Sequence, residues 1–456
     1  MQRSNIKYDM TEGPFLKKVF AFIFPLVLTG LLQCLYNAAD LAIVGKFRGE
    51  IALAAVGSTG PITNLIINLF LGLAVGAGVA VAHYAGAKNS EMVRRTVHTS
   101  ISIAIISGVL VAFIGYFLAK QMLFWMGTPE NVLPYAALYT KIIFLGAPAL
   151  TLYNYCAAIV RSLGDTVRPL IFLSVSGIVN VGLNVFFVTA CNMGVEGVAI
   201  ATIVSQYLAA AMIIVYMYRS NTEIKLRFGK LGLEGKIIKK LLLIGIPSGI
   251  QTSLFSFSNV LLQSSVNSLG DAAMAGVAAA ASLEGFVIVA LDSVYQASIT
   301  FVGQNVGARR YYNIKKILFS CIVAIVAIGS VGILILLPFH EFFLGIYIDD
   351  VTAGSMTAGY ERLFVVMPFC YAIGFMNILS GSLRSMGKSV SAMVVSLFFI
   401  CVFRVVWVQI IFPLAPSVKT IFVSYPVSWI LAAIFNFILL IIAYKKITQS
   451  TDKKQR

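Results

Sequence analysis

Residues 16–44 read LKKVFAFIFPLVLTGLLQCLYNAADLAIV, and this stretch decides the fold class. No charged side chain occurs between residues 19 and 39. An α-helix of about 20 apolar residues is long enough to cross the hydrocarbon core of a bilayer. The rest of the chain repeats the pattern, because 59% of its 456 residues are hydrophobic and only 11% are charged, unlike an average soluble protein. The sequence therefore predicts an all-α membrane protein.

Apolar stretches separated by short polar breaks predict twelve transmembrane helices. Their expected ranges are 16–44, 52–82, 94–118, 132–160, 169–190, 195–218, 238–268, 272–302, 315–338, 358–382, 390–412 and 419–443. An even number of spans places both termini on the same side of the membrane.

The basic residues indicate which side that is. Of the 34 Lys and Arg residues, 27 fall on the side of the termini and Arg404 falls within a span. The loops of the opposite side hold the other six, Lys46, Arg48, Lys120, Lys141, Arg362 and Lys419. The positive-inside rule thus predicts that both termini are cytoplasmic. This orientation accounts for the net charge of +16, so we expect no nucleic-acid partner.

The two halves of the chain repeat each other at an offset of about 221 residues. The matched pairs are Gly49 with Gly270, Gly86-Ala87-Lys88 with Gly307-Ala308-Arg309, Arg94-Arg95 with Lys315-Lys316, Pro25 with Pro247, Pro148 with Pro368, and Arg161-Ser-Leu-Gly164 with Arg384-Ser-Met-Gly387. We therefore expect two pseudo-symmetric lobes of six helices, at 1–218 and 237–456, joined by a cytoplasmic linker at 219–236. Two such lobes can enclose a cavity and open it alternately to either side.

Charged residues inside a span are costly in hydrocarbon, so each is a candidate functional residue. Asp40 lies near the outer end of the first span, with Tyr36 one turn away on the same face. One interpretation is a carboxylate that takes up a proton or a cation and drives a conformational change. The other is an interfacial Asp that water solvates at the membrane edge.

Neutral polar residues follow in the fifth and sixth spans, at Asn180, Asn184 and Thr202. Such side chains can coordinate a cation or hold neighbouring helices together through hydrogen bonds. Secondary candidates in the C-terminal half are Glu284, Asp292 and Arg404. Arg404 either contributes to function or neutralises one of these two acids in a structural ion pair.

The sequence contains no pattern typical of an enzyme or a nucleotide-driven pump. Its three His are far apart, its six Cys form no CxxC pair, and neither an HExxH nor a GxxxxGK[ST] motif is present. We therefore expect no enzymatic activity, no cofactor, and no metal other than a possible Na⁺ at Asp40. Transport would then draw on an ion gradient.

Several motifs resemble the multidrug and toxic compound extrusion (MATE) family over nearly the full length. They are the Asp40 segment with Gly45 and the Ala-Leu-Ala-Ala-Val-Gly run at 52–57, Arg161-Ser-Leu-Gly-Asp-Thr166, and Gly303-Gln-Asn-Val-Gly-Ala308. The resemblance implies a monomeric, twelve-helix antiporter of the bacterial plasma membrane. Such a protein expels cationic or amphipathic small molecules in exchange for H⁺ or Na⁺.

The resemblance also implies roles for single residues. Asp40 matches the family's acid in the first helix, and Tyr36, Asn180 and Thr202 match partners of its N-lobe cation site. Asn184 stands where many members have a second Asp, which leaves the coupling ion and its stoichiometry open. Phe255 and Ile373 replace acids that some branches carry in the C-lobe. Glu284 matches an acid of many bacterial members, and Asp292 has no counterpart that we can assign.

An alternative function is a lipid-linked oligosaccharide flippase of the related two-lobed superfamily. Such a protein would need a large cationic cavity for pyrophosphate, whereas the sequence offers only Arg404 as a clear intramembrane cation. A receptor or scaffold without transport activity would have no use for an acid in the first span.

Overall fold

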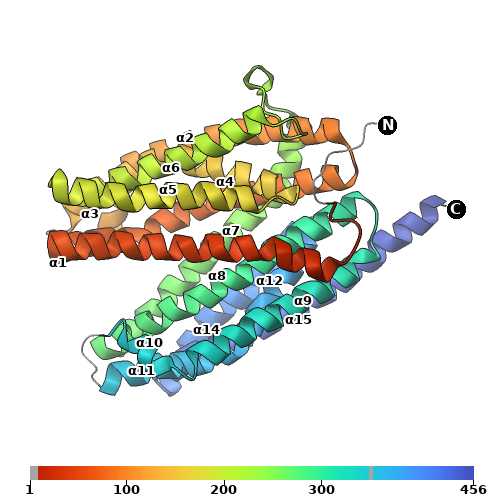
Figure 1. Cartoon of the computed structure of the whole chain (residues 1–456). Coiled ribbons are helices and arrows are strands. Elements are labelled where there is room, and N and C mark those ends of the chain that lie inside the picture. The colour runs from red at the N-terminus through yellow and green to blue at the C-terminus, as the bar shows by residue number, and fades with distance from the viewer. Residues whose placement is uncertain (1–8, 349–352, 456) are drawn as a thin grey trace. The chain divides into compact units, whose positions relative to one another are not determined.

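The computed structural model describes residues 9–348 and 353–455, and all regular elements within those ranges are helical (Figure 1). The α-helices are α1 (Phe15–Gly86), α2 (Ser90–Trp125), α3 (Leu133–Leu145), α4 (Ala147–Ser162), α5 (Val167–Val185), α6 (Val195–Arg219), α7 (Gly235–Asn267), α8 (Asp271–Gly307), α9 (Asn313–Leu336), α10 (His340–Gly345), α11 (Ala353–Val366), α12 (Cys370–Ser385), α13 (Ser389–Ser396), α14 (Phe403–Ile410) and α15 (Val418–Gln455). Short π-helical segments at Phe186–Ala190 and Leu397–Val402 continue α5 and α13.

Helix lengths and compositions confirm the predicted number of spans. Eleven helical segments are long and apolar enough to cross a membrane, two of them within α1, at Phe15–Gly49 and Ile66–Gly86. The bent pair α3 and α4 makes a twelfth if it is one span. The predicted span 132–160 bends by 45° at this break, next to Pro148. In the second half, α11 and α12 are separated by a 3₁₀ turn, Met367–Phe369, that contains Pro368. Both breaks lie beside a proline, and proline interrupts a helix because it has no backbone N–H to donate.

The backbone repeats at the positions where the sequence repeats. Gly49 and Gly270 both have positive φ, 78° and 92°, and each ends the first span of its half. Lys88 and Arg309 are two of the few non-glycine residues with positive φ, at 54° and 58°. This left-handed conformation is uncommon for non-glycine residues, so its occurrence at matched positions supports two structurally similar halves.

The chain forms two compact units. Unit 1 contains residues 28–253, and unit 2 contains residues 10–27 and those from Leu254 onward. Helices α1 and α7 each run from one unit into the other, and each carries one proline of the repeat, Pro25 or Pro247, before the crossing. The sequence repeat places the two lobes at 1–218 and 237–456 and the linker at 219–236. These limits stay a prediction.

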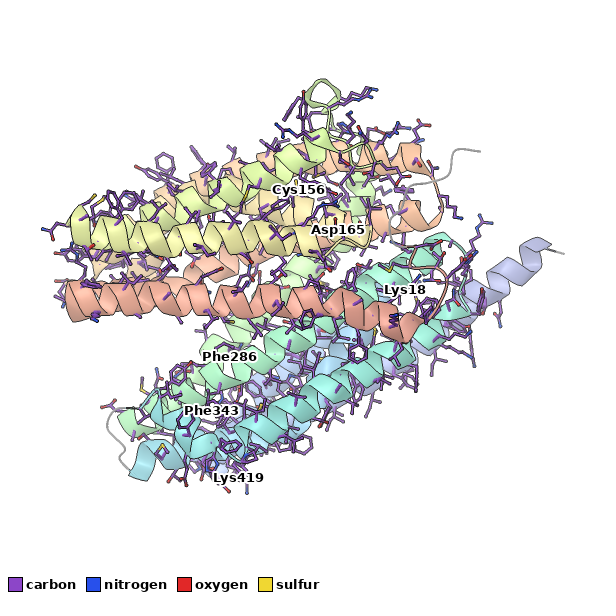
Figure 2. The ribbon with its side chains drawn as sticks, viewed as in Figure 1. Lys18, Cys156, Asp165, Phe286, Phe343 and Lys419 are labelled. Carbon is purple, nitrogen blue, oxygen red and sulfur yellow. The ribbon has the colours of Figure 1, made fainter. Side chains whose placement is uncertain are left out.

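Both units expose large apolar side chains along their helices, as expected for surfaces that face lipid. In unit 1 these include Phe113 and Phe117 of α2, and in unit 2 Phe342 and Phe398. In Figure 2 most of the side-chain atoms drawn along the helices are carbon, in purple. Together with the spans, this surface identifies a multi-pass membrane protein.

Glycines allow two helices of unit 1 to touch backbone to backbone. A methyl group added to Gly72 of α1 would lie 2.1 Å from the backbone nitrogen of Gly249 on α7. One added to Gly76 would lie 2.4 Å from the carbonyl oxygen of Leu241. Small residues at such positions let two helix backbones approach closely inside a membrane protein.

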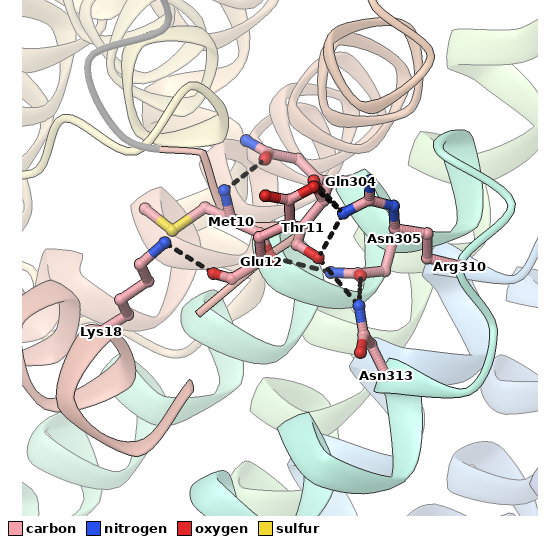
Figure 3. Close-up of polar contacts among 8 residues, drawn as sticks. All are labelled: Met10, Thr11, Glu12, Lys18, Gln304, Asn305, Arg310 and Asn313. Atoms are coloured by element: carbon pink, nitrogen blue, oxygen red, sulfur yellow. Dashed lines mark hydrogen bonds and ion pairs between the residues drawn. The ribbon is translucent and has the colours of Figure 1, made fainter. Parts of the chain in front are cut away.

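The segment before α1 is fastened to unit 2 by buried polar side chains (Figure 3). The Gln304 side chain accepts a hydrogen bond from the Met10 amide at 3.3 Å, and Asn305 donates to the Met10 carbonyl oxygen at 2.9 Å. Asn313 donates to the Thr11 carbonyl oxygen at 2.9 Å and to Asn305 Oδ1 at 2.8 Å. The Gly303–Ala308 motif thus holds the chain that leads into the first span.

Replacing Asn305 by Ala is expected to loosen this attachment. The change leaves the Met10 carbonyl oxygen without its amide donor in a buried place, which costs about 1–3 kcal/mol. Trypsin should then cleave at Lys17 and Lys18 faster than in the wild type, because local opening exposes the segment. Asn221→Ala, at an exposed surface position, should leave the cleavage rate unchanged. Equal rates in Asn305→Ala and the wild type would contradict the proposed attachment.

Candidate functional site

Four of the five predicted N-terminal site residues lie together inside unit 1. Asp40 comes from α1, Asn180 and Asn184 from α5, and Thr202 from α6. The Asn184 amide donates a hydrogen bond to Asp40 Oδ1 and another, of 3.3 Å, to Asn180 Oδ1. Asn180 in turn donates to Thr202 Oγ1 at 3.4 Å. Thr202 also interacts with the Asp40 carboxylate, which closes the cluster.

The amide oxygen of Asn184 is the unusual atom of this cluster. Asn184 is fully buried, and its Oδ1 has no hydrogen-bond partner among the described residues. A buried polar atom without a partner costs free energy, so native structures rarely contain one unless a ligand or water completes it. This oxygen therefore marks a place next to Asp40 where a cation or a proton-carrying water would find an acceptor.

Tyr36 lies on the same helix face but bonds elsewhere. Its hydroxyl donates to the Ser174 carbonyl oxygen at 3.2 Å. Its ring packs on Gly177, where an added methyl group would lie 1.9 Å from a ring carbon. Tyr36 thus contributes to the contact between α1 and α5 and does not hydrogen-bond the carboxylate among the described atoms. The sequence missed Tyr139 of α3, which interacts electrostatically with Asp40 and lies in no recognisable motif.

The C-terminal candidates Glu284, Asp292 and Arg404 are each engaged separately within unit 2. Glu284 is 2% exposed and accepts two hydrogen bonds from Arg362, at 3.0 and 2.7 Å. Arg362, which the sequence placed in an outer loop, belongs to α11 and also lies over the ring of Phe422. The structural ion pair of this unit is therefore Glu284 with Arg362, and Arg404 pairs with neither acid among the described residues.

Asp292 and Arg404 have neutral partners. Asp292 is exposed and accepts a hydrogen bond of 2.9 Å from Asn377. Arg404 is buried, donates to Ser428 Oγ at 2.9 Å, and has its guanidinium carbon 3.9 Å from the ring centroid of Tyr425. Aromatic faces attract a guanidinium group, which helps to keep this charge in an apolar environment.

The oxygen set around Asp40 fits a monovalent cation. It offers one carboxylate, two amide oxygens and one hydroxyl, and hard cations prefer such oxygen ligands. A single carboxylate balances one positive charge. This charge matches a proton or Na⁺, whereas a divalent ion would keep an unbalanced charge.

The fold and this site define the class of the protein, a multi-pass membrane protein with two similar halves and a polar cluster around Asp40 within its first span. The MatE family model matches the chain twice, at residues 25–186 and 247–409, one match in each half. The chain therefore belongs to the MATE family of transporters.

Related proteins match over most of their length. The chain is 28% identical over 389 residues to "Probable multidrug resistance protein YoeA" of Bacillus subtilis, covering 83% of each chain. It is 25% identical over 406 residues to "Probable multidrug resistance protein YpnP" of the same organism, covering 87% of this chain and 88% of the relative. One solved structure is described as an outward-facing multidrug resistance MATE family transporter. It matches this chain with a TM-score of 0.91 at 20% identity, and the match covers 98% of this chain and all of the other. This likeness supports the fold.

Proposed function

We propose that this protein exports cationic or amphipathic small molecules in exchange for H⁺ or Na⁺, which binds at Asp40. The observation that carries the proposal is the Asp40 cluster with the unpaired, buried Asn184 oxygen beside the carboxylate. The relatives named as multidrug resistance proteins support the substrate class. The protein would act as a monomer in the bacterial plasma membrane, with both termini in the cytoplasm.

In this proposal the lobes rock to expose a central site to either side of the membrane. An intramembrane carboxylate that gains and loses a cation biases the equilibrium between two conformations, because each conformation binds the cation with a different affinity. The organic cation and the coupling ion then move in opposite directions. The flippase alternative is less well supported, since Arg362 and Arg404 are engaged by Glu284 and by Tyr425 and Ser428.

Transport by the purified protein in liposomes tests the proposal. Ethidium efflux should follow an imposed pH gradient, an imposed Na⁺ gradient, or both, and separate gradients identify the ion. Efflux at the rate of protein-free liposomes under every gradient would overturn the proposal.

Asn184→Asp provides a prediction about the same site. A second carboxylate beside Asp40 strengthens the attraction for a cation, so the ion concentration that gives half-maximal export should fall by about tenfold. Asn377→Asp places the same change beside Asp292 in unit 2 and serves as the matched control. The control should keep the ion dependence of the wild type. An unchanged ion dependence in Asn184→Asp would contradict ion binding at this site.

A further inference from the structure

A pocket of about 550 Å³ lies in unit 1, between the start of α2 and the connection from α6 to α7. This connection forms the light-green loop at the top of Figure 1. The residues that line the pocket are Glu91, Arg94, Arg95, His98, Thr99, Asn221, Thr222, Lys225, Arg227, Lys230, Gly232 and Glu234. The positive-inside rule predicts that this end of α2 is cytoplasmic. Asp40, in contrast, lies near the predicted outer end of its span.

The connection that forms one wall is folded against α2. Arg95 donates two hydrogen bonds to Glu234, of 2.8 and 2.5 Å, and Ser90 donates one of 2.7 Å to Glu223. Ile224 and Leu226 are buried in the same apolar cluster as residues of α2. The hydrogen bonds from Arg95 hold the pKa of Glu234 below its usual range, so the pair stays ionised near neutral pH. Both walls of the pocket are therefore fixed before any ligand arrives.

One buried imidazole links the two walls. His98 Nδ1 donates to the Arg94 carbonyl oxygen at 2.7 Å, and His98 Nε2 accepts from the Arg227 backbone amide at 3.1 Å. These partners define a neutral imidazole, because one ring nitrogen must carry the proton and the other must not. His98 thereby fixes the backbone positions of two residues, Arg94 and Arg227, whose side chains line the pocket.

The charges of the lining are unbalanced. The lining includes five Lys or Arg residues and two Glu residues, and Arg95 pairs with both acids, Glu234 and Glu91. The other four, Arg94, Lys225, Arg227 and Lys230, form no ion pair with any described residue. The positive-inside rule explains why basic residues are numerous at this side. It does not explain why four of them, unpaired, line one preformed hollow.

We propose that this pocket binds a polyvalent phosphate anion, from an anionic lipid headgroup or from a soluble phosphorylated compound. Guanidinium and ammonium groups bind phosphate oxygens through charge-assisted hydrogen bonds. The volume lies within the range of about 300–1,000 Å³ that is typical of small-molecule pockets and exceeds the needs of a single phosphate. The ligand would bridge α2 and the connection, at a site separate from the Asp40 cluster and independent of the transport proposal.

Two binding measurements on the full-length protein test the proposal and distinguish the sources. In the first, the protein in phosphatidylcholine nanodiscs is titrated with radiolabelled pyrophosphate at physiological ionic strength, where loose surface attraction is screened. In the second, native mass spectrometry counts cardiolipin, whose headgroup carries two phosphates, retained from a mixture with phosphatidylcholine. Binding in either measurement supports the proposal and names the source, and binding in neither overturns it.

Charge variants show whether the anion occupies this pocket. Arg94→Gln with Arg227→Gln removes two unpaired cations and should lower the affinity by about tenfold or more. Lys236→Gln with Lys239→Gln removes the same charge from exposed positions of α7 outside the lining and should change the affinity less than about twofold. An equal loss in both double variants would overturn the proposal.

Glu91→Gln adds a test in which the expected result is a gain of affinity, which a misfolded protein would not give. The Glu91 side chain is 82% exposed, and Glu91 is one of the residues that line the pocket. Removing this negative charge should raise the affinity for pyrophosphate by severalfold, since it would otherwise repel the anion. An affinity that stays the same or falls in Glu91→Gln would contradict anion binding in the pocket.

Discussion

Asp40→Asn is expected to abolish ion-driven export of ethidium by the protein in liposomes. The substitution keeps the shape of the side chain and removes the charge that binds a proton or Na⁺. Asn184, Asn180 and Thr202 still surround the position, but no group in the described cluster then changes its charge or balances a cation. The lobes therefore lose the energetic link between ion binding and conformation, and any remaining ethidium movement should run down its own gradient.

The matched control for this variant is Asp292→Asn. Asp292 is also an intramembrane carboxylate that accepts a hydrogen bond from an Asn side chain, in the other unit. Export by Asp292→Asn should still respond to the ion gradient, even if its affinity for ethidium changes. If Asp40→Asn keeps gradient-driven export, Asp40 does not couple the ion to transport.

Arg362→Met is expected to have the largest effect on stability. Glu284 is 2% exposed, and its two hydrogen bonds from Arg362 balance its charge. Loss of one partner of a buried ion pair leaves an uncompensated charge and costs about 3–5 kcal/mol. A clearly lower midpoint of thermal unfolding of the purified protein should report this loss.

Two further variants show whether the lost partner is the cause. Glu284→Gln together with Arg362→Met removes both charges and should recover much of the stability. Arg95→Met breaks an exposed ion pair of similar two-bond geometry, with Glu234, and should lower the midpoint of thermal unfolding much less than Arg362→Met does. If Arg362→Met destabilises the protein no more than Arg95→Met does, the charge of Arg362 is not needed to balance Glu284.

The fold could be predicted well because membrane insertion leaves few choices. Apolar length decides where helices form, and the predicted all-α membrane protein with two similar halves is confirmed. The exact course of the helices could not be predicted. Hydropathy does not report the 45° bend between α3 and α4, the π-helical continuation of α5, or the assignment of residues 10–27 to unit 2. Those features depend on packing between segments far apart in the chain.

The candidate site was predictable in part. Asp40, Asn180, Asn184 and Thr202 stood out because polar groups are rare inside spans, and the structure brings them together. The partner of Glu284 did not stand out, since Arg362 lies 78 residues away and its charge suggested a loop. The pocket at His98 combines two segments that lie more than 100 residues apart in the sequence. The basic residues could be counted from the sequence, but their position around one pocket could not be predicted.

Ion movement driven by the substrate alone tests the central claim most directly. Liposomes that contain the protein, ethidium and a trapped pH or Na⁺ indicator are diluted into buffer without ethidium, with no ion gradient imposed. As ethidium leaves, liposomes with the wild type are predicted to take up H⁺ or Na⁺, so that the ion becomes more concentrated inside than outside. Liposomes with Asp40→Asn are predicted to take up neither ion. Ethidium efflux through the wild type without movement of either ion would contradict coupling at Asp40.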